Sequence, residues 1–357
     1  MNTIPFLIIS LIKVVIMLFI ILTACAYIVW LERKVVGRIQ NRWGPTRVGP
    51  FGLLQPLADG IKFILKEDIM PDNVNKFWYV AAPMIALVFS LCSIAVIPFG
   101  ECVHIGSYII PLQVTGIWQN GHAQDINIGL LIILGLTSVG VYGIALSGWS
   151  SNSKYALLGS LRATAQMVSY ELALGLSLVG VLMLSGSLSL REIVNHQQGW
   201  FWHWNVLGGG FQFVAFFIYL MAAYAETNRI PFDLPEAETE LVAGYHTEYS
   251  AMKFAMFFVA EYANMVTVAC LATILFFGGW NSPFGSLGMP SNPNLAAVWG
   301  VFWFFVKVLF FIFLYIWIRG TLPRFRYDQL MDFGWKFLLP LAIANIVITS
   351  LIMTIMG

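Results

Sequence analysis

The sequence predicts an all-α integral membrane protein with about eight transmembrane helices and one interfacial amphipathic helix. Of its 357 residues, 59% are hydrophobic and only 10% are charged, whereas a soluble domain carries about 25% charge. Its mean hydropathy of +0.79 agrees with this class. Several apolar runs are as long as the roughly 20 residues that cross a bilayer. The basic residues gather between these runs on one side, as they do in membrane proteins.

The apolar segments follow one another along the whole chain, so we expect a single polytopic membrane domain, residues 1–357. A helix of about 20 residues is long enough to cross the hydrocarbon core. An even number of such helices places both termini on the same side of the membrane. The eight expected spans are residues 4–31, 77–99, 126–148, 155–184, 210–227, 250–277, 296–318 and 336–356.

The distribution of lysines and arginines predicts which loops face the cytoplasm. Loops after odd-numbered spans, with their helix ends, hold sixteen of the 19 basic residues, and the opposite face holds only Arg191. Basic loops stay on the cytoplasmic side, so we expect both termini on the outer face of a bacterial inner membrane, or of a mitochondrial one. The sixteen are Arg33, Lys34, Arg38, Arg42, Arg47, Lys62, Lys66, Lys76, Lys154, Arg162, Arg229, Lys253, Arg319, Arg324, Arg326 and Lys336.

The first inner loop contains a candidate amphipathic helix at residues 53–68. Leu54, Leu57 and Ile61 recur at helical spacing, while Asp59 and Lys62 share the other face. The segment is too short and too charged to span, so we expect it to lie in the membrane interface. A surface helix is the plain alternative. The more specific one is the lip of an entrance for a lipid-soluble substrate.

Other features of the sequence exclude several classes. The net charge of +1 gives no indication of nucleic-acid binding. The four cysteines lie far apart without a C-x-x-C pair, so we expect neither disulfides nor metal ligands. No zinc, haem or iron–sulfur spacing occurs, which predicts a chain without a bound metal or redox centre. The absence of internal repeats argues against the repeat-built transporters.

Two carboxylates fall well inside expected spans, away from their ends. Glu171 lies within the fourth span and Glu261 near the middle of the sixth. An ionised residue at that depth costs at least about 2.5–3.5 kcal/mol and usually faces a bundle interior or water. A purely structural carboxyl, neutral or paired with Lys307 or a backbone donor, is one reading. We favour a proton relay because acids recur in the neighbouring loop.

That loop, the acidic inner loop at residues 226–250, connects the fifth and sixth spans. Glu236 and Glu240 stand four residues apart, on one helical face if Pro235 begins a short helix. Clustered carboxylates repel one another, so protons should be shared among them rather than held by one. The acids therefore form a candidate site whose charge can change.

Four blocks of this sequence resemble a known family of membrane subunits of respiratory complex I, called NADH dehydrogenase subunit 1 or, in bacteria, the H subunit of NADH-quinone oxidoreductase. The run PFDLPEAETE is the most specific part of the resemblance. The blocks are WLERKVVGRIQNRWGPTRVGPFGLLQPLADGIKFILKED (30–68), SLRATAQMVSYE (160–171), AETNRIPFDLPEAETELVAGYHTEYSAMKFAMFFVAEYANM (225–265) and RGTLPRFRYDQLMDFGWKFLLP (319–340).

The resemblance implies a subunit of a proton-translocating NADH:quinone oxidoreductase. Such a subunit anchors the electron-carrying arm to the membrane arm and forms the mouth of the quinone tunnel. The implied substrate is a quinone, ubiquinone or menaquinone. The implied partners are the iron–sulfur and quinone-site subunits of the peripheral arm, small membrane subunits and membrane lipid.

The resemblance also assigns residues to two sites. The outer stretch 191–210 and Lys307 match nothing in the family pattern and receive no role. Positions expected at the quinone are Arg33, Arg42, Asp59, Lys62, Phe232, Phe258, Tyr262 and Arg319. Carboxylates expected in an acidic, proton-coupling funnel are Glu171, Glu226, Glu236, Glu238, Glu240, Glu248 and Glu261.

Three other functions remain as alternatives. A membrane subunit of an energy-converting hydrogenase would share the fold and the acids but reduce no quinone. The amphipathic block and the full PFDLPEAETE run favour the quinone enzyme. A freestanding ion transporter is disfavoured by the lack of repeats. A structural anchor would leave Glu171 and Glu261 without a purpose.

Overall fold

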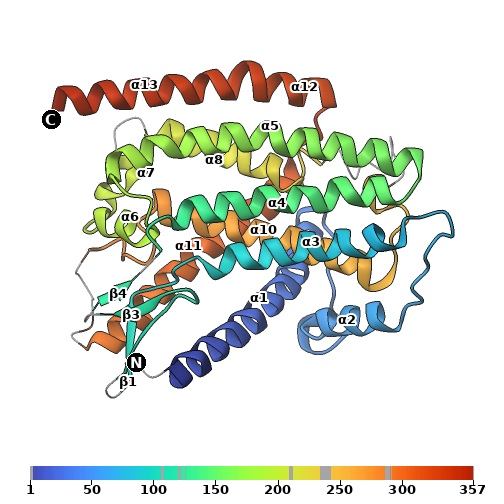
Figure 1. Cartoon of the computed structure of the whole chain (residues 1–357), viewed down its shortest axis with the longest axis horizontal. Helices are drawn as coiled ribbons and strands as arrows, with labels where there is room; N and C mark the ends of the chain where they lie inside the picture. Colours follow the sequence, from blue (N-terminus) through green and yellow to red (C-terminus); the bar gives the residue numbers. More distant parts are fainter. Residues whose placement is uncertain are drawn as a thin grey trace.

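The protein is described by a computed structural model that covers residues 3–105, 108–119, 122–124, 126–208, 212–233, 243–285, 290 and 292–356. It is a bundle of long helices that run in roughly the same direction, with α1 inclined to the others (Figure 1). In the described part, seven helices are long and apolar enough to cross a membrane, which confirms the predicted class. They are α1 (Thr3–Ile39), α3 (Lys76–Ala95), α4 (Gly129–Ser150), α5 (Lys154–Ser185), α10 (Ala251–Phe276), α11 (Pro293–Thr321) and a last helix from Tyr327 to Met356.

The remaining predicted span corresponds to α8 (Gln212–Glu226), a shorter apolar helix of 15 described residues. Helices α3, α4, α5 and α8 pack in that order, α13 covers α5, and α10 contacts α3, α11 and α1. Small residues allow these close contacts. At Gly143 of α4 a Cβ atom would come within 2.9 Å of the Ala82 carbonyl of α3. α10 is the most buried of the long helices, because neighbours surround it.

Two helices extend furthest beyond their predicted bounds, by eight residues or more at one end. α1 continues to Ile39, beyond the expected end at residue 31. The last helix begins as α12 (Tyr327–Asp332), passes through a π-helical turn (Phe333–Leu338) and continues as α13 (Leu339–Met356). Gly334 in that turn permits a close contact, since a Cβ there would lie 3.3 Å from the Tyr170 ring. Packing against α5 thus accompanies the widened turn.

The two ends of the bundle differ in structure. At one end lie the start of α1, the end of α13 and two antiparallel hairpins that the sequence did not predict (Figure 1). The hairpins and short helices of this end are β1 (Cys102–Ile105), β2 (Tyr108–Pro111), β3 (Ile117–Gln119), β4 (His122–Gln124), α6 (Leu190–His196), a 3-10 turn (Phe201–His203) and α7 (Asn205–Gly208).

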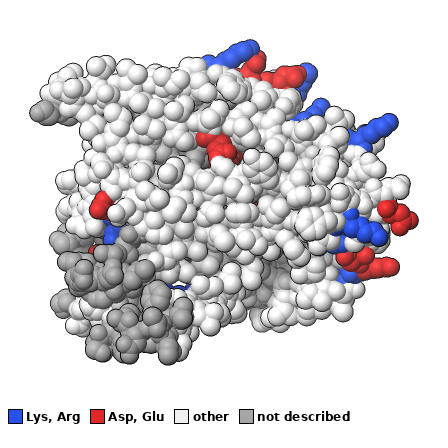
Figure 2. Space-filling view, in the orientation of Figure 1, with Lys and Arg blue, Asp and Glu red and all other residues white. Residues whose placement is uncertain are grey.

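The opposite end carries α2 (Gln55–Leu65) and most of the charged side chains (Figure 2). The short 3-10 turns Pro50–Gly52 and Gly244–His246 also belong to the loops between the odd-numbered spans and their successors. A charged end and a nearly uncharged middle are what a bilayer imposes on a spanning bundle. The candidate site lies where α1, α10, α11 and the segment after α8 meet.

Side chains from distant segments cap the C-terminal end of α10. Lys307 of α11 donates to the carbonyls of Phe277, Gly279 and Asn281 at 2.7, 2.9 and 2.7 Å. Its ammonium also lies 4.2 Å from the centre of the Trp204 ring. The suggestion that Lys307 pairs with a buried carboxylate is therefore wrong. The backbone carbonyls of the turn that follows α10 occupy it instead.

The stretch 191–210, which matched no family pattern, completes the same cap. Gln197 donates to the Ile274 carbonyl at 2.9 Å, and Asn205 donates to the Leu275 carbonyl at 2.8 Å. A polar group buried without a partner is costly, so these contacts stabilise the end of α10. The stretch thus has a structural role that only the fold reveals.

Candidate functional site

Arg229 lies at the centre of a buried cluster of charges. It follows α8 in a short loop, where Asn228 adopts a left-handed conformation with φ 50°. The Nε atom of Arg229 lies 2.6 Å from Oε1 of Glu261 on α10, and its Nη1 atom lies 3.7 Å from Oε1 of Glu32 on α1. The guanidinium also sits 4.2 Å from the centre of the Tyr262 ring. One side chain thus links three elements.

Glu32 is the second centre of this cluster, which we call the arginine–glutamate cluster (Glu32, Arg229, Glu261, Tyr262 and Arg319). The Tyr262 hydroxyl donates to Oε2 of Glu32 at 2.6 Å. Arg319, in the last turn of α11, forms an ion pair with Oε1 of the same carboxylate. Glu32 is only 6% exposed, although it lies among the basic residues at the end of α1.

The charges of this cluster balance when all of its acids are ionised. Two guanidinium groups, of Arg229 and Arg319, face two carboxylates, of Glu32 and Glu261. Removing one partner of such a buried pair costs roughly 3–5 kcal/mol, because the other charge is left without compensation. A change in the charge of one of these four groups therefore favours a compensating change in the protonation or position of the other three.

A row of aromatic rings connects α2 with the arginine–glutamate cluster. Phe254, Phe258 and Tyr262 are spaced by four residues, so they lie on one face of α10. Their neighbouring ring centres are 4.9 and 6.2 Å apart, and Phe63 of α2 lies 6.3 Å from Phe254. The row extends from the amphipathic helix to the buried charges. Of these four residues, Phe258 and Tyr262 were expected at the quinone.

Arg33 and Asp59 were both expected at the quinone, and α1 and α2 bring their side chains together. Arg33 donates from Nη1 to Oδ2 of Asp59 at 2.7 Å, and Gln55 donates to Oδ1 at 2.9 Å. Arg42 and Lys62, expected at the same site, have exposed side chains, and Lys62 lies on α2 while Arg42 lies in the loop before it. The structure places these two apart from the arginine–glutamate cluster.

Phe232 is buried in the core. Its ring stacks on Phe325 with centres 5.5 Å apart and lies 5.9 Å from the ring of Tyr170. The amide of Gln166 donates to the carbonyl of Phe232 and to that of Ala225, both at 2.8 Å. This explains part of the SLRATAQMVSYE block, since Gln166 holds both ends of the segment that carries Arg229.

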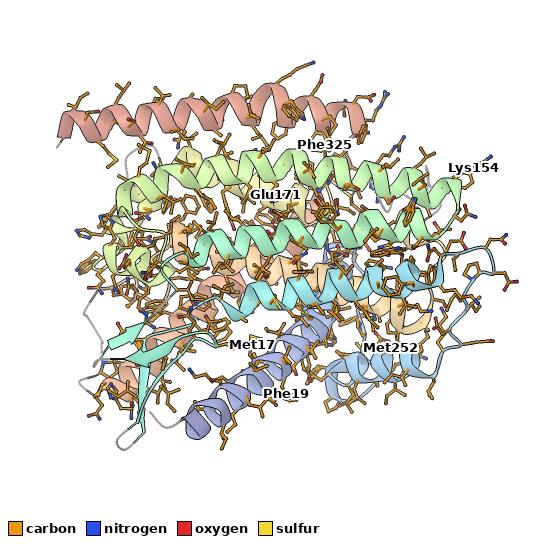
Figure 3. The ribbon with its side chains drawn as sticks, in the orientation of Figure 1. Met17, Phe19, Lys154, Glu171, Met252 and Phe325 are labelled. Atoms are coloured by element: carbon orange, nitrogen blue, oxygen red, sulfur yellow. The ribbon has the colours of Figure 1, made fainter. Side chains whose placement is uncertain are left out.

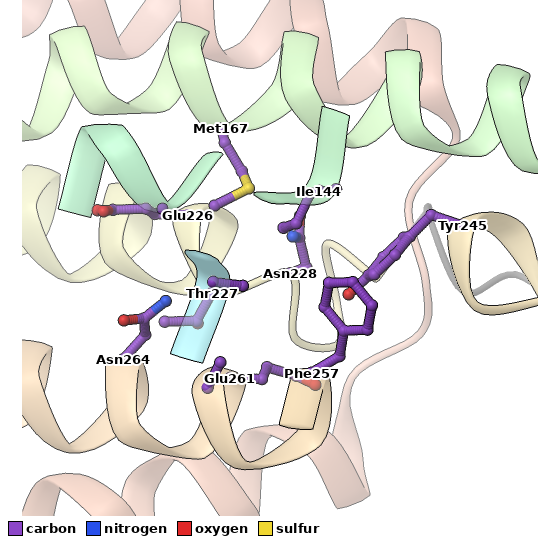
Figure 4. Close-up of a pocket in the computed structure, with 12 residues that line it drawn as sticks. Ile144, Met167, Glu226, Thr227, Asn228, Tyr245, Phe257, Glu261 and Asn264 are labelled. Atoms are coloured by element: carbon purple, nitrogen blue, oxygen red, sulfur yellow. The ribbon is translucent and has the colours of Figure 1, made fainter. Parts of the chain in front are cut away.

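A small cavity lies on the other side of Arg229. Glu226 and Glu261 line it, together with Thr227, Asn228 and Asn264 (Figure 4). About 30 Å³ of this space is accessible to water, which is enough for at least one molecule with polar partners. Two of the expected funnel carboxylates, from α8 and α10, are thus brought to one cavity.

Glu171 and Glu248 lie outside that cavity. Glu171 is halfway along α5 on the face shown in Figure 3, where it accepts a hydrogen bond from Ser138 of α4. It is near enough to Glu226 for the two carboxylates to interact electrostatically. Glu248 is half-buried, and its backbone carbonyl accepts a hydrogen bond from Tyr79. The expected funnel residues Glu236, Glu238 and Glu240 lie outside the described residues.

Sequence reasoning missed Glu32 and Arg229 as site residues. Both were present in the blocks that resemble the family, but Arg229 was counted only as a topology-determining cation. An available signal was that both stand at the end of an apolar helix, where burial of a charge demands a partner. Within the residues that the structure describes, no three His, Cys, Asp or Glu side chains are placed to hold a metal ion.

Comparison with known proteins agrees with this architecture. A family model described as NADH dehydrogenase matches residues 12–350. One relative, the second H subunit of NADH-quinone oxidoreductase from Koribacter versatilis, is 72% identical over 347 residues, 97% of each chain. The second H subunit of the same enzyme from Geobacter metallireducens is 51% identical, over 96% of this chain and 95% of that protein. The first H subunit from Solibacter usitatus is 48% identical, over 97% and 96%.

Proposed function

The chain belongs to the family of H subunits of NADH-quinone oxidoreductase, and from this premise we propose that it forms the membrane entrance for quinone and an acidic pathway that couples quinone reduction to proton movement. Its family and its multi-pass architecture rest on the matches over nearly the whole chain. The roles of single residues are our proposal.

The observation that carries this proposal is the aromatic row ending at the arginine–glutamate cluster. An isoprenoid tail needs an apolar path from the bilayer, and Phe63, Phe254 and Phe258 supply one beside α2. A quinone headgroup needs hydrogen-bond donors at the end of that path. Tyr262 and Arg319 are donors of this kind, already held by Glu32.

The acids beyond Arg229 fit the second half of the proposal. Reduction of a quinone to a quinol takes up two electrons and two protons, and here the electrons would come from iron–sulfur subunits of the assembled enzyme. Proton uptake changes the local charge, and nearby carboxylates respond by changing protonation. Glu226 and Glu261 share a cavity with room for water, and Glu171 interacts with Glu226. We include Glu236, Glu238, Glu240 and Glu248 in this funnel from the family resemblance.

We further propose that the charged end of the bundle faces the cytoplasm of a bacterial cell and meets the peripheral arm there. The asymmetry of the basic residues supports this orientation, which places both ends of the chain on the outer face. α2 would then lie in the inner interface, where its exposed leucine and isoleucine side chains contact lipid. Small membrane subunits would cover part of the remaining apolar surface.

Photolabelling of the complete enzyme tests the proposal. A quinone analogue with a photoreactive group in its tail should attach to α2 or to the segment from Phe254 to Tyr262, and excess natural quinone should prevent the attachment. Equal labelling of the lipid-facing side of α13, unaffected by competition, would contradict the proposed entrance. The exposed Leu351 of α13 provides a reference position for such non-specific labelling.

A further inference from the structure

We propose that Arg229 is a positioning residue that makes the charge states of Glu32 and Glu261 depend on each other. The inference deepens the proposed function and rests on it. In this inference, Arg229 transmits a change at Glu32, next to the proposed quinone site, to the carboxylate of Glu261.

Arg229 lies between two cavities. One cavity is lined by Glu32, Arg229, Tyr315 and Arg319, among others, and the second is the water-sized cavity lined by Glu226 and Glu261. The two have no lining residue in common. The ion pair between Arg229 and Glu261 therefore joins a residue of the first cavity to a residue of the second.

The contacts that Arg229 makes with its two carboxylates are unequal. Its Nε atom lies 2.6 Å from Glu261, whereas its Nη1 atom lies 3.7 Å from Glu32. Because a guanidinium is planar and rigid, its Nε and Nη1 atoms move together, so a movement toward one carboxylate changes the contact with the other. Both carboxylates are mostly buried, with side chains 8% and 12% exposed, so water replaces neither contact readily.

Glu32 also has two partners that could donate hydrogen bonds to a quinone headgroup instead. Tyr262 and Arg319 hold Glu32 now, and both can donate to a carbonyl oxygen instead. Glu32 would then draw Arg229 closer, and Glu261 would lose its cation. A carboxylate in a poorly hydrated site that loses its cation binds a proton more readily, and that proton would arrive through the cavity on the Glu226 side.

Several other ionisable groups belong to the same electrostatic unit, and each contributes to its pH dependence. The charged and titratable groups around Arg229 are Glu32 and Arg33 of α1, Glu226 of α8, Glu261 and Tyr262 of α10, and Tyr315 and Arg319 of α11.

A double-mutant cycle in the complete enzyme tests the inference. The variants are Glu32→Gln, Glu261→Gln and their combination, and the readouts are the rate of quinone reduction and the pH midpoint of that rate. The combined variant should be faster than the product of the two single losses predicts, by at least about threefold. The two single variants should shift the pH midpoint, and their combination should shift it by less than the sum. If the two single losses simply multiply in the combined variant, the inference is overturned. This outcome does not depend on any substitution of Arg229.

The second cycle repeats these variants together with Arg229→Lys, which keeps the charge but replaces the two-sided guanidinium with a single ammonium. The effects of the two glutamate variants should then become independent. Arg326→Lys is the matched control, because Arg326 pairs with Asp328 at 3.2 Å on the exposed surface, outside the arginine–glutamate cluster, and it should preserve the interdependence. Persistence of the interdependence in Arg229→Lys would also overturn the inference. If the unmodified enzyme neither binds quinone nor shows quinone-dependent activity, the proposed function is contradicted instead.

Discussion

Arg33 of α1 and Asp59 of α2 form an ion pair 2.7 Å long that fastens the amphipathic helix to the first long helix. The Arg33 side chain is 52% exposed, so the pair contributes little to the free energy of unfolding. Its consequence is geometric, because it joins α2 to α1 beside the aromatic row on α10.

We expect Asp59→Asn to reduce quinone reduction by roughly tenfold, since small misplacements of a binding element have large effects on rate. Oxidation of NADH by a hydrophilic artificial acceptor, which does not need the membrane entrance, should remain near normal. The charge-swapped pair Arg33→Asp with Asp59→Arg should recover part of the loss. Asp328→Asn is the control, because its pair with Arg326 is fully surface-exposed. Equal loss of both activities in assembled enzyme would count against a role at the entrance.

The carboxylates expected in the proton-coupling funnel provide the second prediction. Glu261→Gln and Glu236→Gln should each lower coupled quinone reduction by about tenfold or more, whereas Glu→Asp at the same positions should be milder. Glutamine keeps the shape and hydrogen bonding of glutamate but cannot ionise. The pH profile of turnover should therefore move together with the rate. Normal turnover, normal proton pumping and an unchanged pH profile would show that these acids are structural.

The third prediction concerns Lys307. Lys307→Met should destabilise the turn at the C-terminal end of α10, because three carbonyls lose their donor and each buried unpaired group costs about 1–3 kcal/mol. The melting temperature of the assembled enzyme, or the yield of assembled subunit, measures the loss. Lys336→Met is the control, since its pair with Asp332 is exposed and should change stability by less than about 0.5 kcal/mol. Equal stability of the two variants would refute the capping role.

The fourth prediction concerns orientation. A membrane-impermeant maleimide should label Asp328→Cys only in inside-out vesicles and Gln198→Cys only in right-side-out vesicles, because both side chains are exposed at opposite ends of the bundle. Native Cys92 and Cys102 should be replaced by serine in both backgrounds to keep the signal specific. Detergent-opened vesicles establish that each position can react at all. The reverse pattern would invert the proposed topology.

The sequence by itself determined the membrane class, the family and nearly all of the spans. Apolar runs of bilayer length and the absence of charge within them leave little freedom, because an unpaired backbone group in lipid is too costly for any element but a helix or a closed barrel. The α2 helix falls within the range that its amphipathic spacing indicated. The family resemblance assigned Arg33 and Asp59 to one site, and that assignment stays a prediction.

Only the tertiary structure decided which charges meet. Glu32 and Arg229 are separated by almost 200 residues, and no periodicity or spacing relates them to Glu261. A local pattern reports which face of a helix is apolar, but ion pairs between helices depend on how those helices cross and rotate in the bundle. The same reason explains Lys307, whose partners are backbone carbonyls at the end of α10. Backbone carbonyls are present at every residue, so the sequence could not mark these three.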